Sequence, residues 1–329
     1  MPRAITLIAA AMLCAGLTAC GATTVSGTPA GTTGTGTATV VSAKTALPPP
    51  ASTLRRVTGF GPNPTGLGMY LYVPRHVRPH PPVIVALHGC GASGPFFFRE
   101  TEFASLADKY GFAVIYPSVT RKPLVCFDVS RPGALTRDGN SDPAAIVSMV
   151  RYVEAHLHAD RHLVFAAGYS SGAMTTNALL ADYPDVFAAG SAMSGTPFGC
   201  FATTDGSLWN SGCAEGRISK TPQQWGNLVR AADPGYSGPR PRVQLFHGTA
   251  DAILRYPNFG EEVKQWTDVL HARLASTARP RPGWTHAVYV NSAGGVEVDA
   301  YSVDGEGHGL VARYPDWARL AISFFGLTR

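Results

Sequence analysis

Unbroken runs of apolar residues, rich in β-branched side chains, recur along the middle of this chain. They cover residues 82–87, 112–116, 163–167 and 243–246. Each run is followed by residues that commonly end a strand. In order, these are His88 with Gly89, Pro117, Gly168, and His247 with Gly248. Continuous rather than alternating apolar runs are typical of strands that are covered on both faces. The pattern therefore predicts a buried, mostly parallel sheet.

Between these runs the apolar positions recur every three or four residues, which indicates helices. Asp142 followed by Pro143 is typical of an N-cap and the first position of a helix. The expected helices cover residues 142–157, 173–181, 259–274 and 317–325. Strands that alternate with helices over residues 53–329 predict one α/β domain of the doubly wound, mostly parallel type.

The first residues have a different pattern. Arg3 precedes an apolar stretch at 5–17 that is too short to cross a bilayer, which is typical of a signal peptide. The stretch ends in LTAC at 17–20, which resembles the lipobox of bacterial lipoproteins and predicts removal of residues 1–19 and lipidation of Cys20. Ordinary cleavage, with Cys20 incidental, is the alternative. Residues 20–52 are rich in Gly, Thr, Ala, Ser and Pro and predict a flexible tether.

Composition adds two constraints. Hydrophobic residues make up 45% of the 329 residues and charged residues 15%, which suits a sizeable core. The net charge of +5 is spread thinly, with no block of like charges, so we expect no nucleic-acid partner. From the signal-peptide pattern and the lipobox we expect an exported protein, outside the cell or in its envelope, that contacts the membrane only through its lipid.

Four cysteines remain if Cys14 leaves with the signal and Cys20 is lipidated. An even number in an oxidising compartment predicts two disulfides, although four buried thiols remain the alternative. Three pairings are possible, and closeness in sequence favours Cys200–Cys213, which leaves Cys90–Cys126. The cysteine and histidine spacings are not those of a zinc site, so we expect no metal and no cofactor.

The segment 168–172 (GYSSG) contains the single G-x-S-x-G of the chain. It directly follows the apolar run at 163–167 and directly precedes the helix expected at 173–181. This strand–turn–helix setting is that of the nucleophile elbow of α/β-hydrolases, which raises the serine hydroxyl above the sheet at the N-terminus of a helix, so an α/β-hydrolase fold is expected. Ser170 is therefore the candidate nucleophile; the alternative is a glycine-rich turn with an incidental serine.

A nucleophile elbow requires an acid and then a histidine, in that order along the chain. Asp251 follows the late strand at 243–246 and is the candidate acid, although a turn or N-cap aspartate is equally compatible with its local sequence. Three histidines follow it. His271 falls in an expected helix and His286 at the start of a strand, whereas His308 lies in a glycine-rich loop. A catalytic base must reach both nucleophile and leaving group, so His308 is the candidate base.

The remaining histidines precede Asp251. His88 and His247 stand at strand ends, where we expect them to support the ends of the strands. The turn HGCG at 88–91 also has the form of an oxyanion-hole turn, although His-Gly is a common strand terminator. The backbone amides of Cys90 and Ser171 are the expected donors, each stabilising the transition state by about 3 kcal/mol.

With these residues the chain resembles carbohydrate esterase family 1, which contains acetylxylan and feruloyl esterases, and the related polyhydroxybutyrate-depolymerase-like esterases. The matching segments lie between residues 65 and 328: LHGC at 87–90, CFDVS at 126–130, NSD at 140–142, MVRY at 149–152, SSGAM at 170–174, YPDVF at 183–187, GCF at 199–201, TPQQWG at 221–226, GY at 235–236, the Asp251 motif and KQWT at 264–267. The segments from TPQQWG at 221–226 to KQWT at 264–267 are most similar to the acetylxylan-esterase branch.

The resemblance implies the same triad, Ser170, Asp251 and His308, with Cys90 and Ser171 as oxyanion donors. It implies a serine carboxylic-ester hydrolase that removes acetyl or feruloyl groups from xylan through an acyl-enzyme. The chain departs from the family pattern at Phe127, where Trp is frequent, at Tyr169, where Thr or Cys is frequent, and in the loop after His308. These departures leave the acyl specificity open.

Two alternatives to this activity remain: hydrolysis of hydroxyalkanoate polyesters, and a lipoprotein that binds polysaccharide without catalysis. Trp225 and Trp266 suit stacking on sugar rings. Trp266 lies on the apolar face of its helix and is expected in the core, whereas Trp225 is compatible with either role. Neither is assigned to the site.

Overall fold

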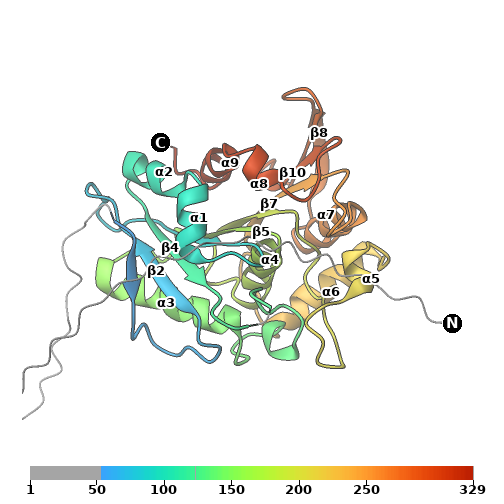
Figure 1. Cartoon of the computed structure of the whole chain (residues 1–329). Helices are drawn as coiled ribbons and strands as arrows, with labels where there is room; N and C mark the ends of the chain where they lie inside the picture. Colours follow the sequence, from blue (N-terminus) through green and yellow to red (C-terminus); the bar gives the residue numbers. More distant parts are fainter. Residues whose placement is uncertain (1–52, 123, 329) are drawn as a thin grey trace, which may run out of the picture. The chain divides into compact units, whose positions relative to one another are not determined.

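A ten-stranded mixed sheet is the centre of the fold in the computed structural model, which describes residues 53–122 and 124–328 (Figure 1). The strand order is β1-β2-β4-β3-β5-β6-β7-β10-β9-β8. The strands are β1 (Arg55–Val57), β2 (Gly68–Tyr72), β3 (Val83–Leu87), β4 (Ala113–Ser118), β5 (Val164–Tyr169), β6 (Ala189–Met193), β7 (Arg242–Gly248), β8 (Arg273–Ala278), β9 (Trp284–Val290) and β10 (Val296–Val303).

The six central strands, from β4 to β10 in that order, run parallel, and the two strands at each end of the sheet are antiparallel to their neighbours. The expected doubly wound, mostly parallel sheet is therefore confirmed. In a parallel sheet the carboxyl ends of the strands share one edge, and the loops that leave β3, β5, β7 and β10 meet there. That edge holds every residue of the candidate site.

Helices cover both faces of this sheet. They are α1 (Gly94–Glu100), α2 (Phe103–Tyr110), α3 (Asp142–Leu157), α4 (Ser171–Asp182), α5 (Ser211–Ala214), α6 (Pro222–Ala232), α7 (Pro257–Val269), α8 (Leu310–Arg313) and α9 (Trp317–Phe324), with a 3₁₀ turn at Pro132–Ala134. The core is split between the two faces: α3, α4, α6 and α7 pack on one, and α1, α2 and α9 on the other.

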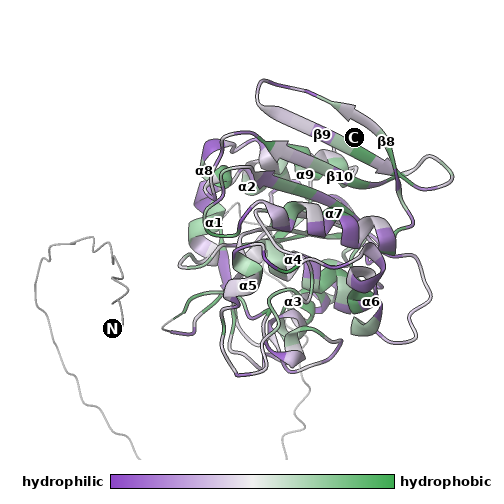
Figure 2. Ribbon diagram, turned by 90° about the vertical axis from the view of Figure 1, so that its right-hand side faces the viewer, coloured by the Kyte–Doolittle hydropathy of each residue, from purple (hydrophilic) through white to green (hydrophobic). Residues whose placement is uncertain are grey.

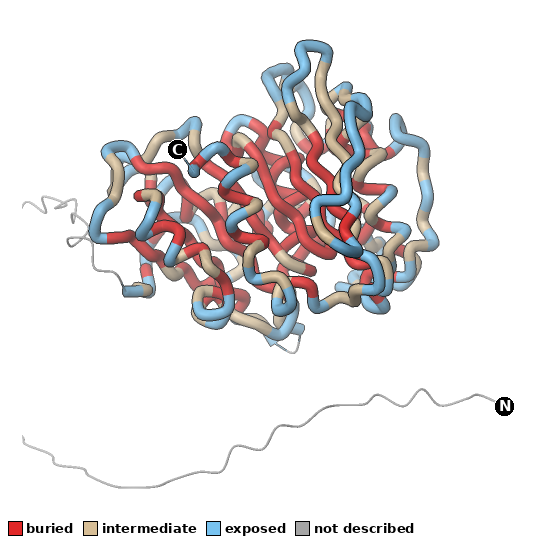
Figure 3. The backbone as a smooth tube through the Cα atoms, turned by 90° about the horizontal axis from the view of Figure 1, so that it is seen from above, coloured by how far each residue is buried: buried red, intermediate tan, exposed pale blue. Residues whose placement is uncertain are grey.

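Alternate residues of the central strands feed these two cores. In β3, Val83, Val85 and Leu87 face the first core, whereas Ile84 and Ala86 face the second, and all five are fully buried. Figure 3 shows the buried strands as a continuous red layer between partly exposed helices. An apolar residue at every position is what a strand covered on both faces needs, so the continuous runs located the central strands.

One central strand has a weaker signal. β6 consists of Ala, Gly, Ser, Ala and Met, and it carries too little hydrophobic character to stand out in the sequence. Small residues are required here because α4 packs closely on it. A Cβ added to Gly190 would come within 2.7 Å of the Thr176 methyl group and 2.8 Å of a Leu180 methyl group.

Three local predictions were wrong. The N-cap of α3 is Ser141, not Asp142, because the buried Asp142 carboxylate binds the Arg121 guanidinium at 2.6 Å instead of capping the helix. The helix expected to reach residue 274 ends at Val269, and residues 273–278 form the edge strand β8, in which Leu274 is exposed. β4 passes through Pro117 to Ser118, since β3 pairs with β4 only as far as Ile115.

The hairpin of β8 and β9 extends the sheet at one end (Figure 2). The expected signal peptide, the lipidated Cys20 and the tether at 20–52 lie outside the described residues. Within residues 53–122 and 124–328, no helix is long and apolar enough to cross a membrane.

Candidate active site

Ser170 stands at the junction of β5 and α4, with a backbone φ of 56° and ψ of −119°. Positive φ is uncommon for residues other than glycine, and it persists where the surrounding structure enforces it, often at functional sites. Here the Ser170 amide donates to the Met193 carbonyl at 2.9 Å. The strained turn holds the serine at the carboxyl edge of the sheet.

The two glycines of the elbow are required by close packing. A Cβ on Gly168 would come within 2.0 Å of the Gly172 carbonyl oxygen, and a Cβ on Gly172 within 2.2 Å of the Leu87 carbonyl oxygen. Both contacts are with backbone, which cannot move aside as a flexible side chain can. Close packing therefore requires glycine at both positions, and it lets α4 begin directly against β3.

The structure brings Ser170, His308 and Asp251 together, although 138 residues separate the first two. His308 Nε2 lies 2.8 Å from Ser170 Oγ, and His308 Nδ1 lies 2.7 Å from Asp251 Oδ2. Ser170 comes from the end of β5, Asp251 from the loop after β7 and His308 from the loop between β10 and α8. This is the relative geometry of a nucleophile, a base and a base-orienting carboxylate.

The Asp251 carboxylate is almost completely buried and is held from several sides. Its Oδ1 accepts from the amides of Ile253 at 2.9 Å and Leu254 at 3.0 Å. Burial alone raises the pKa of Asp251, but the contacts of the carboxylate with His247 and His308 outweigh it, so the pKa lies well below its usual range. Asp251 is thus a fixed negative charge beside the imidazole.

His247 supports this carboxylate as well as the end of β7. Its Nε2 lies 2.7 Å from the Leu254 carbonyl oxygen and 3.4 Å from Asp251 Oδ2. A carbonyl only accepts, so Nε2 carries the proton that it donates to Leu254. The sequence indicated a supporting role for His247 at the strand end; its contact with the acid became visible only in the structure.

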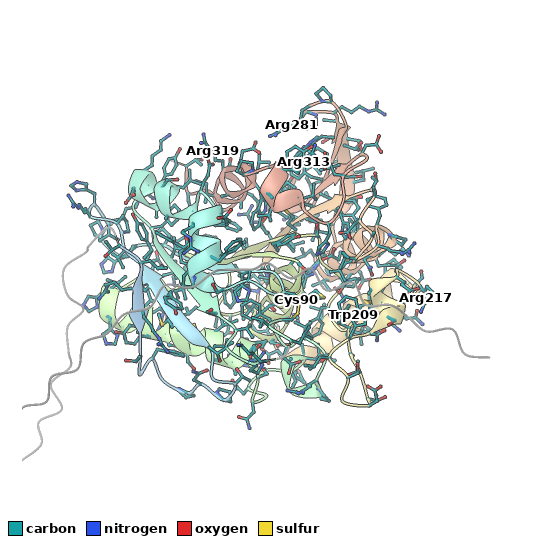
Figure 4. The ribbon with its side chains drawn as sticks, viewed as in Figure 1. Cys90, Trp209, Arg217, Arg281, Arg313 and Arg319 are labelled. Carbon is teal, nitrogen blue, oxygen red and sulfur yellow. A yellow bond between two sulfur atoms is a disulfide. The ribbon has the colours of Figure 1, made fainter. Side chains whose placement is uncertain are left out.

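The two expected oxyanion donors lie on different segments: Cys90 is in the turn after β3, and Ser171 is the first residue of α4. Within residues 53–122 and 124–328, the backbone amides of Cys90 and Ser171 have no hydrogen-bond partner. The turn is held in place by the Cys90–Cys126 disulfide and by the amide of Gly91, which donates to the Val125 carbonyl at 2.9 Å. Cys90 lies near the centre of the view in Figure 4, with the exposed Trp209 to its right.

His88 also supports this turn, through two backbone contacts. The Val119 amide donates to His88 Nε2 at 3.2 Å, so Nδ1 carries the proton and donates to the Gly89 carbonyl at 2.7 Å. Burial lowers the pKa of His88 to about 4, so the ring is neutral at neutral pH. Its expected supporting role at the strand end agrees with these contacts, and both predicted disulfides, Cys90–Cys126 and Cys200–Cys213, are present.

The other candidate residues lie elsewhere. His271 lines a cavity of about 720 Å³ beside the starts of β7 and β10, at the opposite edge of the sheet. His286 lies in β9 and pairs with Asp299. Trp225 and Trp266 are fully buried in the core, with indole N–H groups that donate to Glu261 and Asn177. Neither indole can stack on a sugar, which settles the role left open for Trp225.

Tyr169 is a site residue that the sequence did not assign. Its hydroxyl donates to the His308 carbonyl at 2.8 Å, and its ring lies 5.3 Å from the imidazole, centroid to centroid. The signal was its position next to the nucleophile, where a strand residue points toward the neighbouring loops. In the part of the chain that the structure describes, no group of three or more His, Cys, Asp or Glu side chains is placed to hold a metal ion.

Comparison with known proteins agrees with this geometry. The family model described as Esterase PHB depolymerase matches residues 67–261. Feruloyl esterase B of Talaromyces stipitatus is 41% identical over 283 residues, which cover 84% of this chain and 77% of the relative. Probable acetylxylan esterase A of Aspergillus fumigatus is 38% identical over 280 residues, covering 84% of this chain and 74% of that protein.

Among solved structures, the acetyl xylan esterase from Aspergillus awamori is similar along its whole length. It aligns with a TM-score of 0.79 at 35% identity and covers 84% of this chain and 100% of that one. The resemblance seen in the sequence motifs and the α/β-hydrolase fold are both confirmed. The chain therefore belongs to the esterase family described as Esterase PHB depolymerase, together with acetylxylan and feruloyl esterases that share its fold.

Proposed function

We propose that the protein is a serine esterase that removes acetyl or feruloyl groups from plant polysaccharide, with Ser170, His308 and Asp251 as its catalytic triad. The observation that carries the proposal is the pair of hydrogen bonds at 2.8 and 2.7 Å that join the three side chains. The relatives named as feruloyl and acetylxylan esterases support the substrate class.

The reaction proceeds in two steps. His308 Nε2 takes the proton of Ser170 as the hydroxyl oxygen attacks the ester carbonyl, and the oxyanion is bound by the amides of Cys90 and Ser171. The alkoxide leaves with the proton from His308, and an acyl-enzyme remains. Water then attacks that ester with His308 as base, which releases the acid and restores Ser170. Asp251 keeps the imidazole oriented in both steps.

Exposed hydrophobic side chains adjoin the segments that form the site. Leu124 lies two residues before Cys126, Ile253 lies two residues after Asp251, and Phe96 lies in the helix that follows the Cys90 turn; all three are exposed. Isolated exposed apolar residues are ordinary, but three in segments next to one site support a substrate with an apolar or aromatic part. This observation favours a substrate range that includes an aromatic acyl group in addition to acetate.

The test of the triad is Ser170→Ala with Ser105→Ala as control, since Ser105 is an exposed serine on α2. We expect Ser170→Ala to lower kcat at least about 10³-fold while its unfolding temperature stays near that of the wild type. The control should keep full activity. Esterase activity that survives in pure Ser170→Ala protein would remove Ser170 from the mechanism.

The substrate is tested by kcat/KM on acetylated xylan, methyl ferulate and a hydroxybutyrate trimer. We expect one of the first two to exceed the trimer by more than tenfold. Preference for the trimer would instead establish the polyester alternative, with which the description of the matching family is compatible. A polysaccharide-binding protein without catalysis predicts that a fluorophosphonate leaves Ser170 unlabelled.

We also propose that residues 1–19 are an export signal and that Cys20 carries a lipid. The motif at 17–20 and the two disulfides, which form in oxidising compartments, support this proposal. The test expresses the full chain and Cys20→Ser in a bacterial host and partitions each protein between detergent and aqueous phases. Wild type in the detergent phase and Cys20→Ser in the aqueous phase is the expected result; equal partition would exclude the lipid.

A further inference from the structure

Tyr169 lies where three parts of the site meet. It is the last residue of β5 and precedes Ser170, its hydroxyl donates to the His308 carbonyl at 2.8 Å, and its ring packs on the turn that carries Cys90. A Cβ on Gly89 would come within 2.8 Å of Tyr169 Cδ1 and 2.9 Å of Cε1. One side chain thus contacts the elbow, the oxyanion turn and the histidine loop.

The histidine loop needs such a contact because its own backbone is permissive. Glycines stand at positions 305, 307 and 309, on both sides of His308. A Cβ built on Gly305 or Gly309 would meet no described atom within 4 Å, so close packing does not fix the loop at these positions. Glycine in an open position adds backbone freedom to the chain.

The two ends of the loop are anchored unequally. Before His308, the Glu306 carbonyl accepts from the Ala250 amide at 2.9 Å, and the Gly305 amide donates to Thr249 Oγ1 at 2.8 Å. These bonds connect the loop to the Asp251 segment. At His308 itself, the backbone carbonyl accepts a hydrogen bond from the Tyr169 hydroxyl. It connects the loop to the nucleophile side.

We propose that Tyr169 is a positioning residue that holds the His308 loop against the elbow and the oxyanion turn, so that Nε2 stays within reach of Ser170. The proposal rests on the triad proposed above. The hydroxyl acts on the loop and the ring acts on the turn. Tyr169 itself transfers no proton to the substrate.

The hydroxyl is available as a donor throughout the working range of an esterase. Burial, together with the negative charge of Asp251, raises the pKa of Tyr169 to about 12. The phenol therefore keeps its proton at neutral and mildly alkaline pH. Replacement by Thr would remove both contacts, whereas replacement by Phe removes the hydrogen bond and keeps the ring.

The first test is Tyr169→Phe, with Tyr236→Phe as the matched control. Tyr236 also donates to a backbone carbonyl, that of Pro239 at 2.7 Å, but it lines the cavity at the opposite edge of the sheet. We expect Tyr169→Phe to lower kcat about 3- to 10-fold with KM changed less than about twofold, as for loss of one hydrogen bond. The control should keep the kcat of the wild type.

Phosphonylation of Ser170 separates positioning from substrate contact. A small fluorophosphonate reacts through Ser170 and His308 but has neither sugar nor aromatic acyl group. We expect its second-order rate constant to fall in Tyr169→Phe by the same factor as kcat. An unchanged rate constant, or a change confined to KM, would contradict the positioning role and make Tyr169 a wall of the substrate site.

The second test addresses the ring through a double-mutant cycle of Gly89→Ala and Tyr169→Thr. In the wild type the added methyl group meets the tyrosine ring and should displace the turn, so kcat falls. With threonine at 169 that contact is gone, and Gly89→Ala should cost at least about threefold less in kcat. Equal costs in both backgrounds would show that the ring does not support the turn.

The outcomes also separate this inference from the proposed function. A wild-type protein that neither hydrolyses esters nor reacts with the fluorophosphonate would overturn the triad. A reactive wild type with a Tyr169→Phe variant of equal kcat and equal phosphonylation rate would overturn the role of Tyr169 and leave the triad intact.

Discussion

The elbow at 168–172 and the histidine loop at 305–309 both depend on glycine, but for opposite reasons. In the elbow, added Cβ atoms would come within 2.0 and 2.2 Å of backbone oxygens, so glycine is required by close packing. In the loop, added Cβ atoms at Gly305 and Gly309 would meet no described atom within 4 Å. The nucleophile is therefore held by packing, whereas the base is held mainly by hydrogen bonds.

This difference suits the two roles. A nucleophile and its oxyanion donors must be preorganised, because reorganisation during the reaction would raise the barrier. A base must approach first the serine and then the leaving group, and a loop fixed by a few hydrogen bonds permits that movement. In the proposed mechanism, the hydrogen bonds of the loop with Asp251 and Tyr169 keep the imidazole close to Ser170. Four variants probe the contrast between the two regions.

The largest effect is expected from Gly172→Ala. The new methyl group would lie 2.2 Å from the Leu87 carbonyl oxygen and 2.6 Å from its carbon, so either β3 or the start of α4 must shift. We expect loss of more than about 3 kcal/mol of unfolding free energy, as for severe steric strain in a core. Chemical denaturation followed by circular dichroism measures this loss. A stable, active variant would refute packing control of the elbow.

The next effect is expected from Asp251→Asn. An amide cannot supply the negative charge, and its N–H₂ group offers a donor where His308 Nδ1 needs an acceptor. We expect kcat to fall about 10³- to 10⁴-fold, as when the carboxylate of a triad is replaced. Thermal unfolding should show that the fold is kept. A loss below tenfold would mean that Tyr169 and the loop orient the imidazole without the acid.

A smaller effect, on stability, is expected from Glu262→Gln. Glu262 is fully buried in α7 and accepts from Asn177 Nδ2, in the helix that follows the nucleophile, at 2.6 Å. Burial raises the pKa of Glu262 from 4.5 to about 8. Its stabilising contribution is therefore complete below about pH 4.5 and is lost as pH rises toward 8.

Glutamine keeps the acceptor and cannot ionise. We expect Glu262→Gln to be more stable than the wild type at pH 8 by on the order of 2 kcal/mol, and the gain to disappear near pH 4.5. Unfolding temperatures measured from pH 4.5 to 8 provide the comparison. A gain that does not change with pH would show that Glu262 stays in one protonation state throughout this range.

The smallest effect is expected from Gly309→Ala, the counterpart of Gly172→Ala in the other region. Gly309 has a φ of −78°, which alanine adopts without strain, and open space lies where its Cβ would be. We expect a gain of about 0.5 kcal/mol in unfolding free energy, because alanine restricts the unfolded chain. The kcat should fall by less than threefold. A loss of unfolding free energy as large as that of Gly172→Ala would show that close packing also fixes the histidine loop.

Much of the fold could be predicted from local pattern, and the failures have identifiable causes. The strands β3, β4, β5 and β7 were located because both of their faces are buried. β6 was not, since contact with α4 restricts it to small residues. The helix α7 was extended too far because the apolar residues up to Leu270 continue its period, but His271 turns the chain with a φ of 50° and begins the path to β8.

The candidate site divides in the same way. Ser170, Asp251 and Cys90 each lie shortly after a predicted strand, His308 lies in a glycine-rich loop, and their order along the chain matched a known arrangement. The contact of Tyr169 with the His308 carbonyl and that of His247 with Asp251 were not predictable, since the local sequence does not show which distant segment each side chain meets. Burial likewise decided that Trp225 belongs to the core.

The sequence by itself determined which residues can do the chemistry, because the elbow motif, the strand ends and the cysteines are local features with local physical causes. Only the tertiary structure decided how they are held. The hydrogen bonds between His308 and Ser170 and between Tyr169 and His308 join segments far apart in the chain, and Cys90 and Ser171 follow two different strands. Packing across the sheet creates these contacts, and a pattern along one chain does not record them.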